Sequence, residues 1–161
     1  VIRYPNMSCQ MPEGEALKRI PGKSELLSKG EELLIIGLGH MAYQALEVKE
    51  QLLKKHGINA SVLDPVFIKP LDQEMLCGLL QNHNRIIVIE EHSINSGFGS
   101  IISHFLVSNG FSNVPVLNFA LPESFFHQGS YQNIMEDLGL SVEKIVRRIE
   151  TEFSLNQMAT L

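Results

Sequence analysis

The most constraining feature of this sequence is a set of short, continuous apolar runs that recur at regular intervals. The strongest lies within Arg85–Glu91, and Leu33–Ile36 is a second of the same kind. A strand with one solvated face alternates apolar and polar residues, so an unbroken run indicates a strand that is covered on both faces. Ala60–Leu63 and Val114–Phe119 are two further strands by this criterion. The chain is therefore expected to build a sheet with helices on both sides.

Helical segments separate these runs. Asp72 and Ser141 stand where they can cap two of the helices, and Gly57 is placed to end another. Strands that alternate with helices predict an α/β fold, here three α/β/α layers around a mostly parallel five-stranded sheet with right-handed crossovers. Residues 24–28 supply the fifth strand, at an antiparallel edge of the sheet. The expected helices cover residues 40–56, 72–81, 97–109 and 141–153.

Composition divides the chain into three parts. Residues 1–24 are irregular and contain prolines and glycines, which indicates the end of a preceding domain followed by a linker. Residues 25–153 carry the regular pattern and form the compact domain. Residues 154–161 have no clear period and are expected to be a disordered tail. Because the first residue is Val1 and no signal sequence follows, we expect a piece of a longer chain.

Charge and cysteine content exclude several classes of function. The 161 residues contain 13 Lys and Arg against 18 Asp and Glu, a net charge of −5 without a basic run, so nucleic acid is not the expected partner. No apolar stretch approaches the roughly 18 residues of a membrane span. Cys9 and Cys77 lack metal-ligand spacing, so no metal site is expected, and a reducing intracellular compartment fits them best.

Two interpretations remain open for the segment Gly37–Ala42. It matches G-x-G-x-x-A between a strand and a helix, which is the context of a dinucleotide-binding fingerprint, and Asp64 ends the next strand where a ribose-binding acid would stand. Alternatively, a tight strand-to-helix turn needs glycine whatever it binds, and Asp64 before Pro65 opens a turn. An independent nucleotide-binding module is therefore one candidate.

The segment Glu90, Glu91 and His92 ends the most buried strand. Ligands bind at the carboxyl ends of parallel strands, and the amides that open the next helix near Gly97 can hold an anion. Neighbouring carboxylates oppose an anion, so we favour a polar contact with another domain or subunit for these three residues.

A second candidate contact lies after the last strand, where Phe125 and Phe126 are adjacent in a polar loop. Aromatic residues in such a loop indicate packing against a neighbouring domain. His127 has no acid or nucleophile at a diagnostic spacing, so we count it with the contact residues. No nucleophile elbow, phosphate loop or His-x-x-x-His pair is present, and no catalytic residue is predicted in this chain.

Several segments together resemble the C-terminal region of the transketolase class of thiamine-diphosphate enzymes. The ordered series is more specific than any single motif, and it covers nearly the whole chain. The segments that carry the resemblance are Val1–Pro5, Val62–Asp72, Val88–His92, Gly97–Ser100, Leu117–Pro122, Phe126–Ser130 and Leu138–Ser141.

This resemblance implies a third domain that serves packing and dimer formation. The later segments are similar to class members that condense pyruvate with glyceraldehyde 3-phosphate, release carbon dioxide and supply isoprenoid and thiamine biosynthesis. Such enzymes are cytoplasmic homodimers, or plastid ones in plants. Their thiamine diphosphate and magnesium are bound by the two preceding domains, so the resemblance implies that this chain binds neither and is inactive alone. The class has no dinucleotide at the turn corresponding to Gly37–Ala42.

One substrate-binding residue is implied by the same resemblance. The Arg-Tyr-Pro motif of the class closes the middle domain, and its arginine, here Arg3, contacts the phosphate of the aldehyde substrate. A guanidinium can hold two phosphate oxygens at once. A second arginine usually follows the proline, but Asn6 stands there in this sequence. The alternative within the class is the corresponding domain of a transketolase or of a pyruvate dehydrogenase beta subunit.

Overall fold

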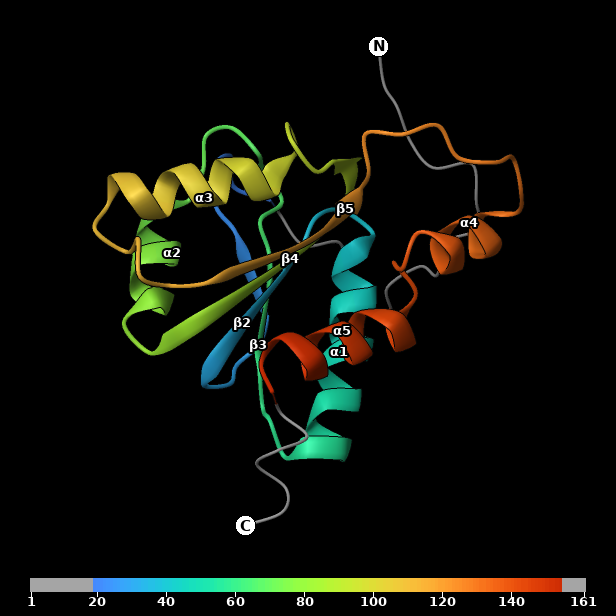
Figure 1. The fold of residues 1–161 in the computed structure, drawn as a ribbon. Coiled ribbons are helices and arrows are strands. Elements are labelled where there is room, and N and C mark those ends of the chain that lie inside the picture. The colour runs from blue at the N-terminus through green and yellow to red at the C-terminus, as the bar shows by residue number, and fades with distance from the viewer. Residues whose placement is uncertain (1–18, 155–161) are drawn as a thin grey trace.

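Five strands form one sheet in the computed structural model, which describes residues 19–154 (Figure 1). The order across the sheet is β1-β3-β2-β4-β5. All neighbouring strands are parallel except β1 and β3, which are antiparallel, with Glu25 opposite Asp64. The prediction of a mostly parallel five-stranded sheet with one antiparallel edge strand is confirmed. The strands are β1 (Glu25–Ser28), β2 (Glu32–Gly37), β3 (Ser61–Asp64), β4 (His83–Ser93) and β5 (Val116–Leu121).

The central strands β2 and β4 are buried on both faces, as their unbroken apolar runs predict. Alternate side chains of β2 enter two different cores: Leu33 and Ile35 face one, and Leu34 and Ile36 face the other. Burial of both faces explains why these strands carry no polar residue at their centres.

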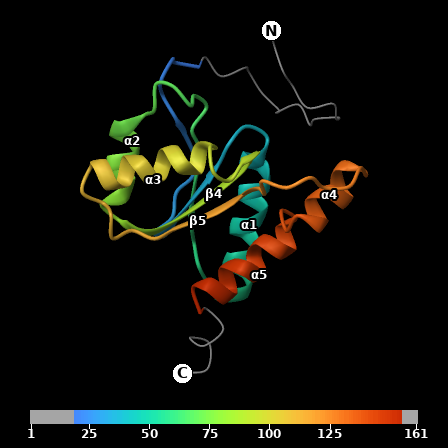
Figure 2. The ribbon, with the colours of Figure 1, turned by 45° about the horizontal axis from the view of Figure 1, so that its top comes forward.

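Helices cover both faces of the sheet, which gives the three predicted layers (Figures 1 and 2). Residues of α1 and α5 fill the core on one face, and residues of α2 and α3 fill the core on the other. In both views α4 lies beyond the sheet, next to the start of α5. The helices are α1 (Met41–His56), α2 (Gln73–Leu80), α3 (Phe98–Ser108), α4 (Tyr131–Asp137) and α5 (Val142–Glu152).

Two of the three predicted helix ends are as expected. The Asp72 carboxylate accepts a hydrogen bond from the Met75 amide at 3.2 Å and so caps α2. Gly57 adopts a left-handed conformation, with φ of 70°, and ends α1. Ser141 occupies the N-cap position of α5, but its hydroxyl makes no capping hydrogen bond, so the expected cap is wrong in this respect.

Helix α4 was not predicted, because it has only seven residues, of which Met135 is buried. No helix among the described residues is long and apolar enough to cross a membrane. The predicted linker and Arg3 fall largely or wholly within residues 1–18, and the predicted tail falls mostly within residues 155–161; both ranges lie outside the described residues.

Candidate functional site

The carboxyl edge of the sheet contains a crevice at which the chain changes direction. The connection after β2 runs through α1 on one face to β3, whereas the connection after β4 runs through α3 on the other face to β5. In open α/β sheets this switch point, between the carboxyl ends of the two strands, is where functional residues gather. In this molecule His40 follows β2 and Glu91 lies near the end of β4, so both stand at the switch point.

Three polar side chains meet there and are called the carboxyl-edge cluster: His40, Glu91 and Tyr131, the first residue of α4. His40 Nε2 lies 3.1 Å from Glu91 Oε2 and 2.9 Å from the Tyr131 hydroxyl oxygen. An ionised carboxylate oxygen can only accept a hydrogen bond, so the proton of the histidine is on Nε2 and points to Glu91. The cluster therefore joins the loop after β2, the end of β4 and α4.

Each member of the cluster has a displaced pKa. The hydrogen bond to Glu91 outweighs the effect of burial and raises the pKa of His40 above 6.5. Burial raises the pKa of Glu91, but hydrogen bonds with His40 and Tyr131 outweigh it, and the net pKa lies below 4.5. Burial, followed by the interaction with Glu91, raises the pKa of Tyr131. The cluster thus favours a protonated histidine beside an ionised carboxylate.

These shifts predict that the cluster stabilises the fold most between about pH 4.5 and 6.5. The His40 contribution is fully present below the pKa of the unfolded state and is lost as pH rises through the higher pKa of the folded state. The Glu91 contribution is present above its unfolded pKa and is lost as pH falls through the lower folded one.

We expect the difference in unfolding free energy between the wild type and His40→Asn to shrink steadily from pH 6 to pH 9. Urea denaturation followed by circular dichroism measures this difference. A Tyr131→Phe variant, which keeps the ring but lacks the hydroxyl, serves as a second probe of the cluster. A difference that stays constant across the pH range would contradict the assignment.

Glu90, the neighbour of the cluster, is turned inward and is only 1% exposed. Its two carboxylate oxygens accept hydrogen bonds from the amides of Phe98, at 2.7 Å, and Gly99, at 2.8 Å. A Cβ atom at Gly97 would overlap the Glu90 carboxylate, which explains the glycine at this position. The amides near Gly97 were considered above as an anion site. They already bind a carboxylate of the chain itself, that of Glu90.

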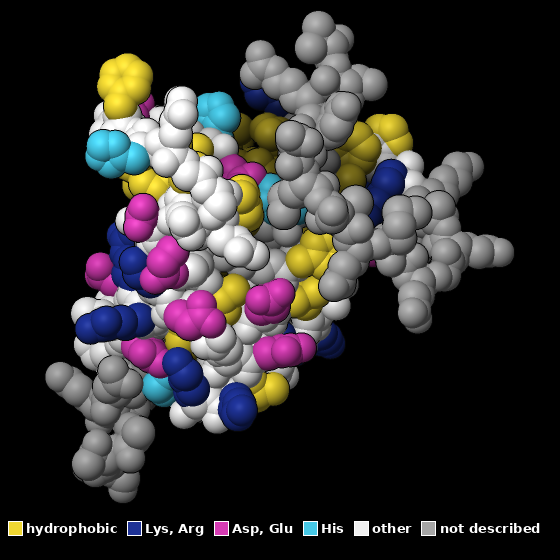
Figure 3. All heavy atoms as spheres, turned by 90° about the vertical axis from the view of Figure 1, so that its right-hand side faces the viewer, with side chains coloured by type: hydrophobic (Ala, Val, Ile, Leu, Met, Phe, Trp, Pro, Cys, Tyr) yellow, Lys and Arg dark blue, Asp and Glu magenta, His cyan; other side chains and the backbone are white. Residues whose placement is uncertain are grey.

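The other predicted contact residues are exposed. His92 lies on the surface after Glu91, and the loop of residues 122–130 exposes His127 together with both aromatic side chains. Phe125 is fully exposed and Phe126 is 46% exposed. Figure 3 shows this side of the molecule, with hydrophobic and histidine side chains near the top and charged side chains over the lower half. The contact with Tyr131 thus places Glu91 next to the loop of residues 122–130, whereas Glu90 is buried away from it.

The glycines of Gly37–Ala42 are explained by the turn they form. A Cβ atom at Gly37 would overlap the backbone of Met41 and Ala42, and Gly39 has a φ of 64°. The Asp64 carboxylate accepts a hydrogen bond from the Val66 amide at 2.8 Å, which makes it the first residue of a turn. These contacts favour the second interpretation given above, a tight strand-to-helix turn.

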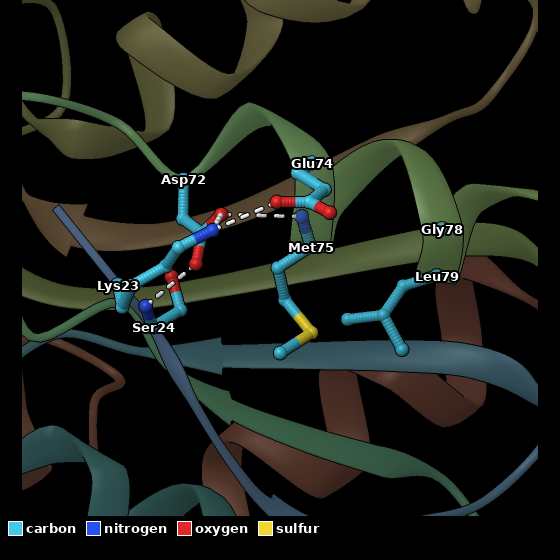
Figure 4. A pocket seen from close by; sticks show the side chains of 7 residues that line it. All are labelled: Lys23, Ser24, Asp72, Glu74, Met75, Gly78 and Leu79. Carbon is cyan, nitrogen blue, oxygen red and sulfur yellow. Dashed lines mark hydrogen bonds and ion pairs between the residues drawn. The ribbon is translucent and has the colours of Figure 1, made fainter.

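A cavity of about 410 Å³ lies between the start of β1 and α2, and sequence reasoning missed it (Figure 4). Its floor is apolar, and Lys23 stands at its rim with Nζ 2.8 Å from Glu74 and 3.6 Å from Asp72. Asp72 also accepts a hydrogen bond from the Ser24 amide at 2.8 Å. The lining thus carries one positive charge, on Lys23, against two negative charges, on Asp72 and Glu74. Among residues 19–154, no group of His, Cys, Asp and Glu side chains is arranged to hold a metal ion.

Comparison with known proteins gives consistent matches. Residues 22–145 match the family model described as "Transketolase, C-terminal domain". The chain is 46% identical over 157 residues to the 1-deoxy-D-xylulose-5-phosphate synthase of Chlamydia felis, and 42% identical over 159 residues to that of Chlamydia pneumoniae. Each match covers 95% of this chain but only 24% of the relative, so the chain spans about a quarter of the length of these curated relatives.

Two solved structures resemble the fold. A split-gene transketolase, described as an inactive beta4 tetramer, superposes with a TM-score of 0.78 and 28% identity, over 89% of this chain and 47% of that one. A 2-oxoglutarate:ferredoxin oxidoreductase from Magnetococcus marinus superposes with a TM-score of 0.53 and 19% identity, over 81% of this chain and 19% of that one. The second match shows the fold alone.

Proposed function

This chain belongs to the transketolase C-terminal domain family, and we propose that it serves as the C-terminal domain of a 1-deoxy-D-xylulose-5-phosphate synthase. The observation that carries the proposal is the 46% identity over 95% of the chain, well above the 28% identity with the transketolase structure. In this proposal residues 1–24 end the preceding domain and form a linker, residues 25–153 are the domain, and residues 154–161 are a tail.

The full-length enzyme is proposed to condense pyruvate with glyceraldehyde 3-phosphate in the cytoplasm. Thiamine diphosphate would supply the carbanion chemistry, and magnesium would hold its diphosphate. Two features of the described residues support a diphosphate site outside this domain. The carboxylates of Glu90 and Glu91 at the switch point oppose a diphosphate, and the amides that open α3 already bind Glu90.

The domain itself is proposed to pack against the rest of the enzyme and to contribute to a homodimer. The support comes from the surface at the carboxyl edge. The exposed Phe125 and Phe126 offer apolar area, and Glu91, His92 and His127 offer polar groups around it. A buried aromatic centre with a polar rim is the usual composition of a protein interface.

Arg3 is proposed to bind the phosphate of the aldehyde substrate in the full-length enzyme. Removing one charged hydrogen-bond donor of this kind costs about 1.4 kcal/mol or more, which corresponds to roughly tenfold in binding. We therefore expect Arg3→Ala to raise KM for glyceraldehyde 3-phosphate about tenfold or more and to leave KM for pyruvate nearly unchanged. Arg3→Lys keeps the positive charge but loses the planar two-donor geometry of the guanidinium. Its KM for glyceraldehyde 3-phosphate should therefore lie between those of the wild type and Arg3→Ala.

Steady-state kinetics of the full-length enzyme with both substrates tests the proposal. The 161-residue chain, assayed in parallel with thiamine diphosphate and magnesium, should give no product. Equal effects of Arg3→Ala on both Michaelis constants would argue against the phosphate contact. Turnover of transketolase or pyruvate dehydrogenase substrates in place of this pair would overturn the proposed activity.

A further inference from the structure

Polar contacts near both ends of the aromatic loop, residues 122–130, connect it to the last residues of β4. At one end the Ser93 hydroxyl donates a hydrogen bond to Glu123 Oε1 at 3.1 Å. At the other end Tyr131 is held by the carboxyl-edge cluster, to which β4 contributes Glu91. Residues 91 and 93, near the end of β4, thus each contact one end of the loop.

Between these two contacts the loop exposes its aromatic side chains to water. Phe125 is fully exposed and Phe126 is 46% exposed, although burial of a phenyl group away from water is favourable. The described part of the chain uses polar groups to hold the two ends of the loop, and it leaves Phe125 uncovered and Phe126 about half covered. This combination of anchored loop ends and exposed aromatic groups is typical of a docking element.

The direction in which the chain enters the domain identifies the partner. Because β1 is antiparallel to β3, its first residue, Glu25, lies opposite Asp64 at the carboxyl end of β3. Just before β1, the amide of Ser24 is bound to the buried Asp72 carboxylate (Figure 4). The chain therefore enters at the carboxyl edge of the sheet, the edge to which β4 and β5 lead and at which the aromatic loop begins.

The chain leaves the domain at the opposite edge. The Arg85 guanidinium lies 5.1 Å from the centre of the Phe153 ring, and Phe153 lines a small cavity with Leu33. Leu33 and Arg85 belong to the amino ends of β2 and β4. Whatever precedes this domain in a longer polypeptide is thus attached at the carboxyl edge. The aromatic loop lies at the same edge, although it follows β5, the strand farthest from β1 in the sheet.

From this arrangement we infer that the aromatic loop docks on the part of the same polypeptide that precedes this domain, in an apolar recess that accepts Phe125 and Phe126. The inference rests on the proposed function, because the relatives are about four times as long as this chain. Attachment at the same edge gives the preceding part a high effective concentration at the loop, which a second copy of the chain lacks.

The accessibility of cysteine probes in the full-length enzyme tests this inference. Ser124→Cys places a thiol in the loop without altering either phenylalanine, and Ser108→Cys places one at the exposed end of α3, toward the amino edge. Alkylation by a maleimide, followed by peptide mass spectrometry, gives the rate at each site. Gln128→Cys is a second loop probe should Ser124→Cys fail to fold.

We expect the loop thiol to react at least tenfold more slowly than the control thiol. Adding Phe125→Ser to the loop probe should restore fast reaction, and dilution that dissociates the dimer should leave the protection unchanged. Equal alkylation rates at the two sites would overturn the inference. Protection that disappears when the dimer dissociates would also overturn it, because the loop would then be covered by a second copy of the chain. Turnover measured on the same samples reports on the proposed function separately.

Discussion

Glu90→Ala is expected to lower the free energy of unfolding by about 3 kcal/mol. The Glu90 carboxylate accepts hydrogen bonds from the Phe98 and Gly99 amides in a site that is only 1% exposed. Alanine removes both acceptors and leaves two buried donors at the start of α3, each costing roughly 1–3 kcal/mol. The gain from removing a buried charge offsets part of this loss.

Urea denaturation of this chain measures the effect of the substitution. Glu47→Ala is the matched control, because it makes the same chemical change at an exposed position of α1 and should stay within about 0.5 kcal/mol of the wild type. Glu90→Gln keeps the shape and one acceptor oxygen, so it should be intermediate. A loss below about 1 kcal/mol for Glu90→Ala would show that solvent replaces the carboxylate at α3, contrary to our assignment.

Phe119→Ala is expected to cost about 4 kcal/mol, the second large effect. The Phe119 side chain is only 1% exposed and belongs to the core between the sheet and the helices α1 and α5. The Arg148 guanidinium lies 5.2 Å from the centre of its ring and adds a cation–π contact. Alanine would leave a cavity among side chains that strands and helices hold in place.

Phe125→Ala provides the comparison within the same chain. The chemical change is identical, but Phe125 is fully exposed, so its loss should change the unfolding free energy of the 161-residue chain by less than about 0.5 kcal/mol. Both variants can be measured by thermal and urea denaturation. Similar losses for the two variants would mean that the aromatic loop is packed in this chain, which is incompatible with its role as a docking element.

The sequence predicts the fold well because the sheet is buried on both faces. The apolar runs of β2 and β4 have no polar interruptions, and the apolar face of α1 extends over most of the helix. The local pattern therefore agrees with the tertiary environment. The fifth strand, β1, was placed at the antiparallel edge as predicted. Helix α4 was missed, since a seven-residue helix with one buried residue leaves too short a pattern.

The candidate site was only partly predictable. His40 and Tyr131 are 91 positions apart and meet through the topology of the sheet, which no spacing in the sequence reveals. Glu90 and Glu91 look equivalent in the sequence, but neighbouring residues of a strand point to opposite sides, so one is buried and the other joins the cluster. One usable signal was Gly97, which stands seven positions after Glu90. The Glu90 carboxylate occupies the space that a side chain at position 97 would fill, so a glycine is required there.

The resemblance to the transketolase class is confirmed by the family match, and it came from the order of several motifs. The fingerprint at Gly37–Ala42 is a single motif and is compatible with more than one role. Its glycines satisfy the geometry of a turn, and the same geometry serves dinucleotide sites in other α/β proteins.

The inward carboxylate of Glu90 also affects how the start of α3 responds to anions in solution. Many helix starts at a switch point remain open and take up phosphate or sulfate from solution, which ties their order to the composition of the medium. Here the counter-charge is covalently part of the strand that precedes the helix. The start of α3 therefore receives its acceptor from the chain itself and needs no anion from solution.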